Sequence, residues 1–232
     1  MRLTVMSHLT VDGVMQSNGK PEPELNDGFQ HGGWQVPYFD QDLDRLTADW
    51  FAAADAFLLG RQTYELFADY WSQVTDPDDP RATRLNSLPK YVASTTLAGP
   101  LQWNNSTLLT GNVAEEVAEL KRRPGNELQV HGSAALIGTL MEHDLIDEYR
   151  LLINPVVLGS GRRLFADGTT PTALELIDTK ITGSGVAVHI YRPSGKPQYG
   201  SAVAEQDGDV FKDSVARSAG NAAASKPNAG AS

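Results

Sequence analysis

The chain has 232 residues, a formal net charge of −10 at pH 7 and no cysteine. The negative charge disfavours nucleic acid and anionic membranes as main partners, and the missing thiols exclude disulfides, thiolate zinc sites and cysteine nucleophiles. No apolar run approaches the roughly 20 residues that span a bilayer, and no basic segment leads into an apolar one at the N-terminus, so we expect a cytoplasmic protein.

The N-terminal part predicts a strand, a long loop and a helix. Residues 3–10 are typical of a strand that leads into a turn at 11–13, and a loop rich in glycine and proline follows over 17–37. Loops of this length inside a compact domain are usually functional. Apolar residues recur at helical spacing over 42–54, which predicts a helix there.

A short apolar strand then ends at Gly60, and a helix over about 61–70 begins at once. Helix starts present unpaired N–H groups and a positive dipole end, which together can hold an anion. Gly60 lets a ligand approach the backbone, Thr63 adds a hydroxyl donor, and Arg61 offers a two-pronged guanidinium that suits a phosphate monoester. The added arginine favours NADP over NAD. The alternative is that Arg61 only pairs with a surface carboxylate.

The next elements are shorter. Acidic and proline residues break the chain at 76–80, and two strands are predicted over 90–96 and 106–109. A helix over 113–122 follows, with Asn112 as its N-cap.

A second strand–glycine–helix junction lies at Gly132. A strand over 128–130 precedes it, and a helix with an apolar face runs on to about residue 143. Two such junctions in one small domain can hold the two ends of a dinucleotide. The arrangement is not the Rossmann fingerprint, because Gly-x-Gly-x-x-Gly is absent after the first strand.

The C-terminal part predicts a strand over 148–153 and a β-hairpin formed by 173–181 and 186–192. Strands that alternate with helices and end in an antiparallel pair predict an α/β sandwich around a mixed sheet. From about residue 202 the composition shifts to alanine, serine and glycine. We therefore expect one folded domain over 1–200 and a disordered tail over 201–232.

Five segments carry a resemblance to a known family: Thr10–Gln16, Phe57–Tyr64, Pro89–Thr96, Val130–Ser133 and Asn154–Gly161. In this order they resemble the dihydrofolate reductase-like superfamily, specifically stand-alone relatives of the reductase domain of bacterial riboflavin biosynthesis. The resemblance covers about residues 2–200. It implies a three-layer α/β/α sandwich around a mixed, mostly parallel sheet of eight strands, NADPH as cofactor and a homodimer.

The resemblance also implies which residues bind NADPH. They are Gly60, Arg61 and Thr63 at the pyrophosphate and 2′-phosphate, Ser94 and Thr95 beside the 2′-phosphate, Gly132, Ser133 and Ala134 in a second pyrophosphate loop, and Asp12 and Gly13 in a turn against the nicotinamide. The riboflavin-type enzymes usually have a lysine directly after this turn, whereas Val14 stands here.

Three residues are candidates for the reacting centre. Asp12 is the first, although an aspartate before glycine is also a common turn former. Trp34 can stack on a flat heterocycle or pack inside its loop, and Tyr38 allows the same two interpretations. His31 in the same loop titrates near neutrality and can lie over the substrate, or it can simply be solvated.

Further polar residues allow two interpretations each. His8 and His131 lie near strand ends and can touch the cofactor or be hydrogen-bonded core histidines. Arg162 and Arg163 can grip a substrate phosphate or be solvated. The histidines share no metal-ligand spacing, so no metal site is predicted.

These features favour an NADPH-dependent reductase of a small heterocyclic or carbonyl substrate, related to 5-amino-6-(5-phosphoribosylamino)uracil reductase. A different class remains open: a non-catalytic NADPH-binding sensor or interaction module. A third reading, dihydrofolate reductase itself, lacks the expected pattern around a pterin-binding carboxylate. The hydride chemistry would belong to the cofactor, and the protein would position the reactants.

Overall fold

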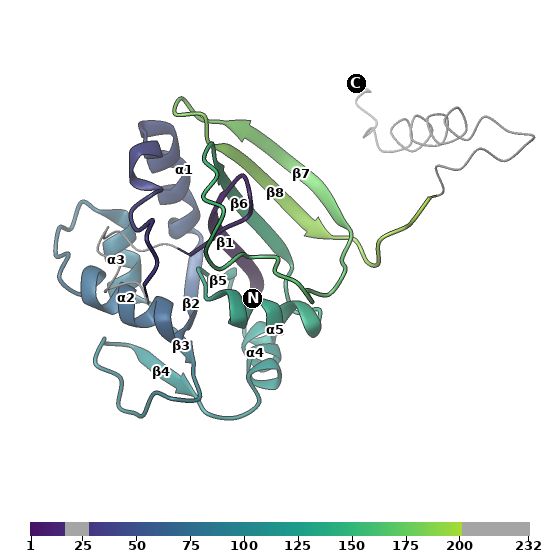
Figure 1. The fold of residues 1–232 in the computed structure, drawn as a ribbon. Helices are drawn as coiled ribbons and strands as arrows, with labels where there is room; N and C mark the ends of the chain where they lie inside the picture. The colour runs from purple at the N-terminus through teal and green to yellow at the C-terminus, as the bar shows by residue number, and fades with distance from the viewer. Residues whose placement is uncertain (17–27, 201–232) are drawn as a thin grey trace, which may run out of the picture. The chain divides into compact units, whose positions relative to one another are not determined.

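The strands form one eight-stranded sheet in a computed structural model that describes residues 1–16 and 28–200 (Figure 1). The order across the sheet is β4-β3-β2-β5-β1-β6-β8-β7. The strands are β1 Arg2–Thr10, β2 Ala54–Gly60, β3 Lys90–Ala93, β4 Ser106–Leu109, β5 Glu127–Val130, β6 Glu148–Asn154, β7 Leu174–Ile181 and β8 Ala187–Pro193. The first six in this order run parallel, and β8 and β7 are antiparallel additions. The expected mixed, mostly parallel sheet with a C-terminal hairpin is confirmed.

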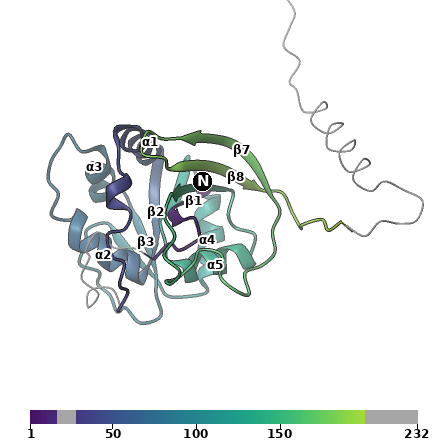
Figure 2. The same ribbon diagram turned by 45° about the horizontal axis from the view of Figure 1, so that its top comes forward.

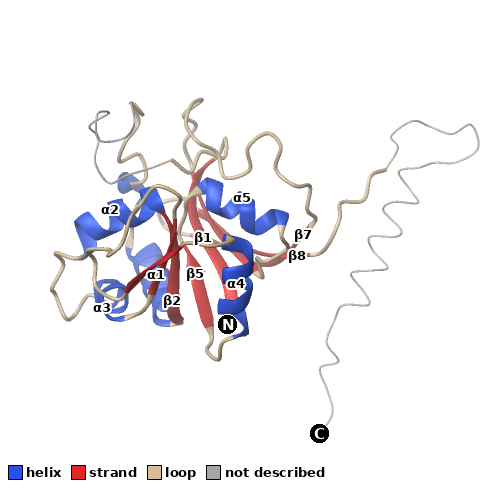
Figure 3. Ribbon diagram, turned by 90° about the horizontal axis from the view of Figure 1, so that it is seen from below, coloured by secondary structure: helices blue, strands red, loops and turns tan. Residues whose placement is uncertain are grey.

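Helices cover both faces of the sheet and complete the expected three layers (Figure 3). On one face lie α1 Gln41–Ala52, α2 Arg61–Trp71 and α3 Pro80–Ser87, and on the other lie α4 Val113–Arg122 and α5 Ala134–Glu142. A short 3₁₀ helix, η2, spans Val36–Tyr38 just before α1. Each face has its own apolar core. The β7–β8 hairpin lies at the edge of the sheet beyond β6, and Figure 2 shows its two strands side by side.

The central strands are apolar on both faces because helices cover both. In β2, Ala56 and Leu58 pack toward α4 and α5, whereas Phe57 and Leu59 pack toward α1, α2 and α3. This two-sided burial explains why the sequence of β2 is a nearly continuous apolar run and does not alternate between apolar and polar residues.

The helices differ in how they begin. The side chains of Asp40, Asp79 and Asn112 cap α1, α3 and α4. By contrast, α2 and α5 have no side-chain cap, and each starts within a few residues of a strand end. Capping side chains satisfy the orphan N–H groups of a first turn, so α2 and α5 keep those groups for another partner.

Some predicted boundaries were wrong. The sequence predicted only a chain break at residues 76–80 and missed the helix α3. Asp79 is the N-cap of this helix, and Pro80 is its first residue. The strand predicted over 90–96 ends at Ala93, because its partner β2 also ends there, with Gly60 paired to Ala93. The helix predicted to reach residue 54 stops at Ala52, and Ala54 already belongs to β2.

Residues Met1–Gly195 form one compact unit. The predicted tail, 201–232, lies outside the described residues. In the part of the chain that the structure describes, no helix is long and apolar enough to cross a bilayer.

Candidate functional site

The carboxyl ends of six parallel strands meet at one edge of the sheet, in the order β4, β3, β2, β5, β1, β6. From β2 the chain adds β3 and β4 outward, and it then returns to place β5 and β6 on the two sides of β1. In open α/β sheets, ligands bind outside the carboxyl ends of the strands where the strand order reverses in this way. The junctions at Gly60 and Gly132 both lie at this reversal, on the neighbouring strands β2 and β5.

The two glycine junctions touch each other. The N–H of Gly60 donates to the carbonyl oxygen of Gly132 over 2.9 Å. A Cβ atom at Gly60 would lie 2.4 Å from Ser133 Oγ, and one at Gly132 would lie 2.7 Å from Thr63 Oγ1. Gly132 also has a φ of +133°, a backbone conformation that L side chains rarely adopt. Only glycines allow the starts of α2 and α5 to come this close.

The paired helix starts fit phosphate groups. Neither α2 nor α5 has a side-chain cap or an acidic residue in its first turn, whereas α1 and α4 carry acidic residues there. The positive dipole ends of the two helices therefore meet with no acidic side chain in either first turn. An arrangement of this kind can hold an anionic group. Ala134 lies at the first position of α5.

Arg61 lies at the first position of α2, and its guanidinium contacts a carboxylate on the next turn. Its Nη1 lies 3.2 Å and 3.5 Å from the two carboxylate oxygens of Glu65. The side chains are 44% and 47% exposed, so both remain accessible to a ligand. Arg61 thus pairs with a surface carboxylate, as the alternative interpretation expects, and its guanidinium is exposed enough for a phosphate to reach it as well.

Ser94 and Thr95 follow directly on β3, beside the start of α2. Because Gly60 pairs with Ala93, the next residues of both strands leave the sheet side by side. Ser94 Oγ accepts hydrogen bonds from the N–H groups of Thr96 (3.1 Å) and Leu97 (3.0 Å), which fix this turn, and Thr95 is exposed. The hydroxyls predicted near the 2′-phosphate therefore neighbour Arg61 in the fold.

The Asp12–Gly13 turn follows the end of β1, beside the loop after β6. Gly13 has a φ of +79°, so a glycine is required there. The Asp12 carboxylate accepts hydrogen bonds from Thr10 Oγ1 (2.6 Å), from Gly159 N (2.8 Å) and from Leu158 N (3.2 Å). The bond from the Thr10 hydroxyl is the main cause that lowers the pKa of Asp12 to about 2. Asp12 is therefore an ionised brace between two loops and not a proton donor at neutral pH.

The loops after β1 and β6 are joined by further hydrogen bonds. Met15 N donates to Arg162 O (2.9 Å), Leu164 N donates to Gly13 O (3.1 Å), and Arg163 Nε donates to Asp12 O (2.9 Å). Arg163 thus supports the turn. The result is a firm platform at the carboxyl ends of β1 and β6.

Trp34 and Tyr38 have structural roles in this conformation. Trp34 is 8% exposed, packs with Val14 and Phe29, and donates its indole N–H to Gln16 O over 2.9 Å. The packed-loop interpretation describes it better than a ring that is free to stack on a substrate. Tyr38 is partly buried against the core, and its carbonyl accepts from Ser184 Oγ (2.6 Å), which ties η2 to the β7–β8 turn.

His131 is held between three aromatic rings and a hydrogen-bond partner. Its ring stacks on Phe51 at 4.9 Å and lies 5.7 Å and 5.8 Å from the rings of Phe57 and Phe67. Its Nε2 lies 3.3 Å from Gln129 Oε1. Burial lowers the pKa of His131 to about 3, so the ring is neutral near pH 7.

His8 is the second histidine on this face of the sheet. It stacks on Phe39 at 5.5 Å, and burial lowers its pKa to about 4. Its Nδ1 is buried and has no hydrogen-bond partner among the described residues. The interpretation of His131 as a hydrogen-bonded core histidine therefore fits the structure, whereas His8 retains an unused polar atom.

Sequence reasoning missed a buried ion cluster on the same face. Arg150 Nη2 lies 2.6 Å from Glu127 Oε1, and Arg150 Nε lies 3.0 Å from Glu148 Oε1. These side chains are at most 7% exposed. Burial alone would raise the pKa of Glu127, but the hydrogen bond from Gln129 and the charge and hydrogen bond of Arg150 lower it overall. The signal was the placement of charged residues at inward positions of strands β5 and β6.

The ion cluster connects to the site through Gln129. The side-chain Nε2 of Gln129 donates to Glu127 Oε2 (2.6 Å) and to the carbonyl oxygen of Trp50 (2.5 Å). Because both partners can only accept, the amide nitrogen of Gln129 must face them. Its Oε1 must therefore face His131, and the neutral His131 ring carries its proton on Nε2. This chain of contacts fixes the orientation of the ring at the end of β5.

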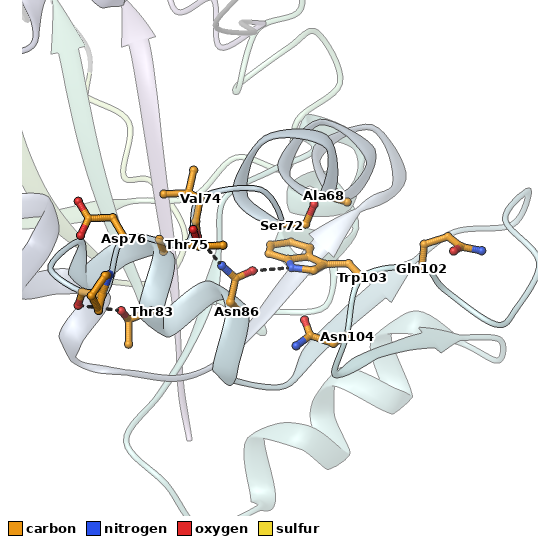
Figure 4. Close-up of a pocket in the computed structure, with 12 residues that line it drawn as sticks. Ala68, Ser72, Val74, Thr75, Asp76, Thr83, Asn86, Gln102, Trp103 and Asn104 are labelled. Carbon is orange, nitrogen blue, oxygen red and sulfur yellow. Dashed lines mark hydrogen bonds between the residues drawn. The ribbon is translucent and has the colours of Figure 1, made fainter.

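A separate cavity of about 590 Å³ lies at the far end of α2 (Figure 4). Ser72 at the end of α2, Asn86 of α3 and Trp103 before β4 contribute to its lining. Two of these residues are joined by a hydrogen bond, which Trp103 Nε1 donates to Asn86 Oδ1 over 2.8 Å. Because α2 starts at the carboxyl edge and runs back about 16 Å, this cavity is remote from the glycine junctions.

The sheet and its covering helices have the dihydrofolate reductase-like fold. The family model of the RibD C-terminal domain matches residues 2–189, and the chain belongs to this family. A relative is the uncharacterized protein YyaP of Bacillus subtilis, 34% identical over 172 residues that cover 73% of this chain and 90% of YyaP.

Solved structures share the fold. A structure named as a riboflavin biosynthesis protein from Shewanella sp. PV-4 has a TM-score of 0.65 at 21% identity and covers 84% of this chain and 99% of its own. The deaminase/5-amino-6-(5-phosphoribosylamino)uracil reductase of Thermotoga maritima has a TM-score of 0.55 at 13% identity, over 83% of this chain and 56% of its own. Dihydrofolate reductase from Enterococcus faecalis, complexed with NADP(H), has a TM-score of 0.52 at 12% identity, over 83% and 96%.

Proposed function

We propose that the protein is an NADPH-dependent reductase that transfers a hydride to a small heterocyclic or carbonyl substrate. The observation that carries this proposal is the contact between the junctions at Gly60 and Gly132, which brings two uncapped helix starts to one point of the carboxyl edge. Membership of the RibD C-terminal domain family supports a reductase, and the NADP(H)-bound relative of the same fold supports the cofactor class.

The described residues suggest how each part of the cofactor would be held. Thr63, Ser133 and Ala134 lie at the paired helix starts and would hold the pyrophosphate, and Arg61 with Ser94 would hold the 2′-phosphate. The turn at Asp12 and Gly13 lies three strands away from β3, about 14 Å along the edge. A cofactor bound in this direction would have its adenosine end over β3 and β2 and its nicotinamide near β1. NADPH would supply the hydride when bound.

Residues near β1 and β6 would shape the substrate space. Val11 and Val157 are 63% and 65% exposed on loops that a backbone hydrogen bond joins, and Phe39 is 46% exposed beside His8. In a bound complex these exposed side chains would give the substrate an apolar surround that suits a flat, uncharged ring. Asp12 is ionised and His8 is neutral near pH 7, so neither stores a transferable proton, and the proton would come from water.

A binding module without turnover is the second possibility. It is favoured by the fact that Asp12, Trp34 and Tyr38 all make structural contacts.

We also propose a homodimer and a cytoplasmic location. The outer strand β7 exposes Leu176, Ile177 and Ile181, which a second copy can cover, and sedimentation would measure this association.

The test combines binding with turnover. NADPH should quench tryptophan fluorescence with a micromolar dissociation constant, and a panel of pterins, pyrimidine precursors and small carbonyl compounds should contain at least one substrate that oxidises it. Binding without any oxidation would favour the module. If neither NADPH nor NADH binds at millimolar concentration, the reductase proposal fails.

A further inference from the structure

Glu65 is the acidic residue that neutralises Arg61 at the start of α2. It lies one turn further along the helix, where side chains four residues apart share a face. Its carboxylate contacts the guanidinium at 3.2 Å, and each side chain is a little less than half exposed. The first turn of α2 contains no acid, so Glu65 places a negative charge beside a helix start that otherwise favours anions.

We propose that Glu65 sets the preference between phosphorylated and unphosphorylated dinucleotides by weakening the hold of Arg61 on the 2′-phosphate. The inference rests on the proposed function, because it concerns the cofactor that the reductase would bind. In this proposal Glu65 and Arg61 have opposite effects on the choice of cofactor. The protein therefore prefers NADPH over NADH less strongly than it would with Arg61 alone.

The first reason is competition for one cation. Arg61 must exchange the Glu65 carboxylate for the 2′-phosphate when NADPH binds. An exposed ion pair of this kind is worth at most a factor of about five in an equilibrium constant. NADH has no 2′-phosphate, so its binding leaves the pair of Arg61 and Glu65 intact.

The second reason is repulsion. A phosphate monoester carries nearly two negative charges at pH 7, and a group held by Arg61 would lie within a few ångströms of the Glu65 carboxylate. The neighbouring residues Ser94 and Thr95 are uncharged and do not offset this repulsion. A carboxylate near a ribose is, in contrast, a hydrogen-bond acceptor for the free 2′-hydroxyl of NADH.

The chain contains a matched control for this pair. Glu119 and Arg122 form an ion pair within α4, and their side chains are 60% and 67% exposed. This pair lies on the opposite face of the sheet from α2, near the C-terminal end of α4 and away from the glycine junctions. The substitution Glu119→Gln removes the same charge from the protein without touching the proposed cofactor site.

The experiment measures the dissociation constants of NADPH and NADH by tryptophan fluorescence for the wild type, Glu65→Gln, Arg61→Ala and Glu119→Gln. Glu65→Gln should tighten NADPH about three- to tenfold and leave NADH unchanged or slightly weaker, so the NADPH preference rises at least threefold. Arg61→Ala should lower this preference, and Glu119→Gln should leave both constants within twofold. Thermal unfolding of each variant checks that it is folded.

Two negative outcomes have different meanings. If wild type binds NADPH but Glu65→Gln leaves the ratio of the two constants unchanged or lowers it, the inference about Glu65 is wrong and the proposed reductase stands. If wild type binds neither dinucleotide, the proposed function itself is wrong, and this inference falls with it.

Discussion

His131 and Asp12 follow the neighbouring strands β5 and β1, and the surroundings of each side chain fix its protonation state. Three phenylalanine rings keep His131 neutral, with a pKa of about 3, while hydrogen bonds keep Asp12 ionised, with a pKa of about 2. Only the shift of His131 removes a titration from the range around pH 7, because an aspartate already titrates well below neutrality. Each of these two side chains therefore keeps one charge state across the physiological pH range.

The buried histidine makes stability depend on pH. Because the pKa of His131 is lowered in the folded state, the unfolded chain takes up a proton below about pH 6.5 while the folded protein does not. Stability is therefore full above that pH and falls as the pH drops toward 3, and the loss from His131 is about 3 kcal/mol at pH 4.5. Urea unfolding at pH 7 and pH 4.5 measures it.

The substitution His131→Phe should keep the ring contacts and remove the proton uptake. The difference in unfolding free energy between the two pH values should then shrink by about 3 kcal/mol, although His8 still contributes. Replacement of the exposed His143 by glutamine is the control. An unchanged pH dependence in His131→Phe would mean that His131 titrates normally in the folded protein.

The elements that build the site are the strand–glycine–helix units, and their close contact depends on the absence of two side chains. A methyl group at Gly132 would meet Thr63 Oγ1 at 2.7 Å and would also require an unfavourable φ. The starts of α2 and α5 would have to separate. The hydrogen bond from Gly60 to Gly132 would be the first contact to suffer.

Two alanine substitutions test this point. Gly132→Ala should destabilise the protein by about 1–3 kcal/mol and weaken NADPH binding at least tenfold, because the backbone strain and the displaced helix start act together. Gly138→Ala, in the middle of α5, meets nothing within 4 Å and should be neutral or stabilise by about 0.5–1 kcal/mol. Equal NADPH affinity in both variants would show that the junction does not hold the cofactor.

Local patterns predicted the elements that carry the site, because a strand, a glycine and a helix follow each other within ten residues. The short helix α3 escaped prediction, since it buries only Ala82 and Leu85 and depends on a distant partner. Arg81 of α3 forms an ion pair over 2.7 Å with Asp44 of α1, which lies 37 residues earlier in the chain. Such a contact is invisible in any window of sequence.

Contacts between distant segments limited the prediction of the site itself. Glu127 and Arg150 are 23 residues apart, and Asp12 and Gly159 are 147 apart, so neither the ion cluster nor the brace was anticipated. Trp34 was expected near the substrate because it lies in a long loop, and its burial depends on Phe29 and Val14. The sequence patterns predicted the two strand–glycine–helix junctions better than the contacts of the loops around them.

In the molecule as a whole, the residues proposed to hold the cofactor lie along one edge of the sheet. The protein has a net charge of −10, yet its two uncapped helix starts and Arg61 lie together at the ends of β2 and β5. The platform at β1 and β6 continues this edge. An extended dinucleotide along the edge would join the two regions.

The most direct test is an NADPH titration of the isotope-labelled protein, followed through the backbone amide signals. The account predicts that the amides of residues 60–63 and 132–134 shift together, with one dissociation constant, and that those around Asn86 and Trp103 stay unchanged. Shifts confined to the cavity beside Asn86, or to one glycine junction without the other, would contradict it.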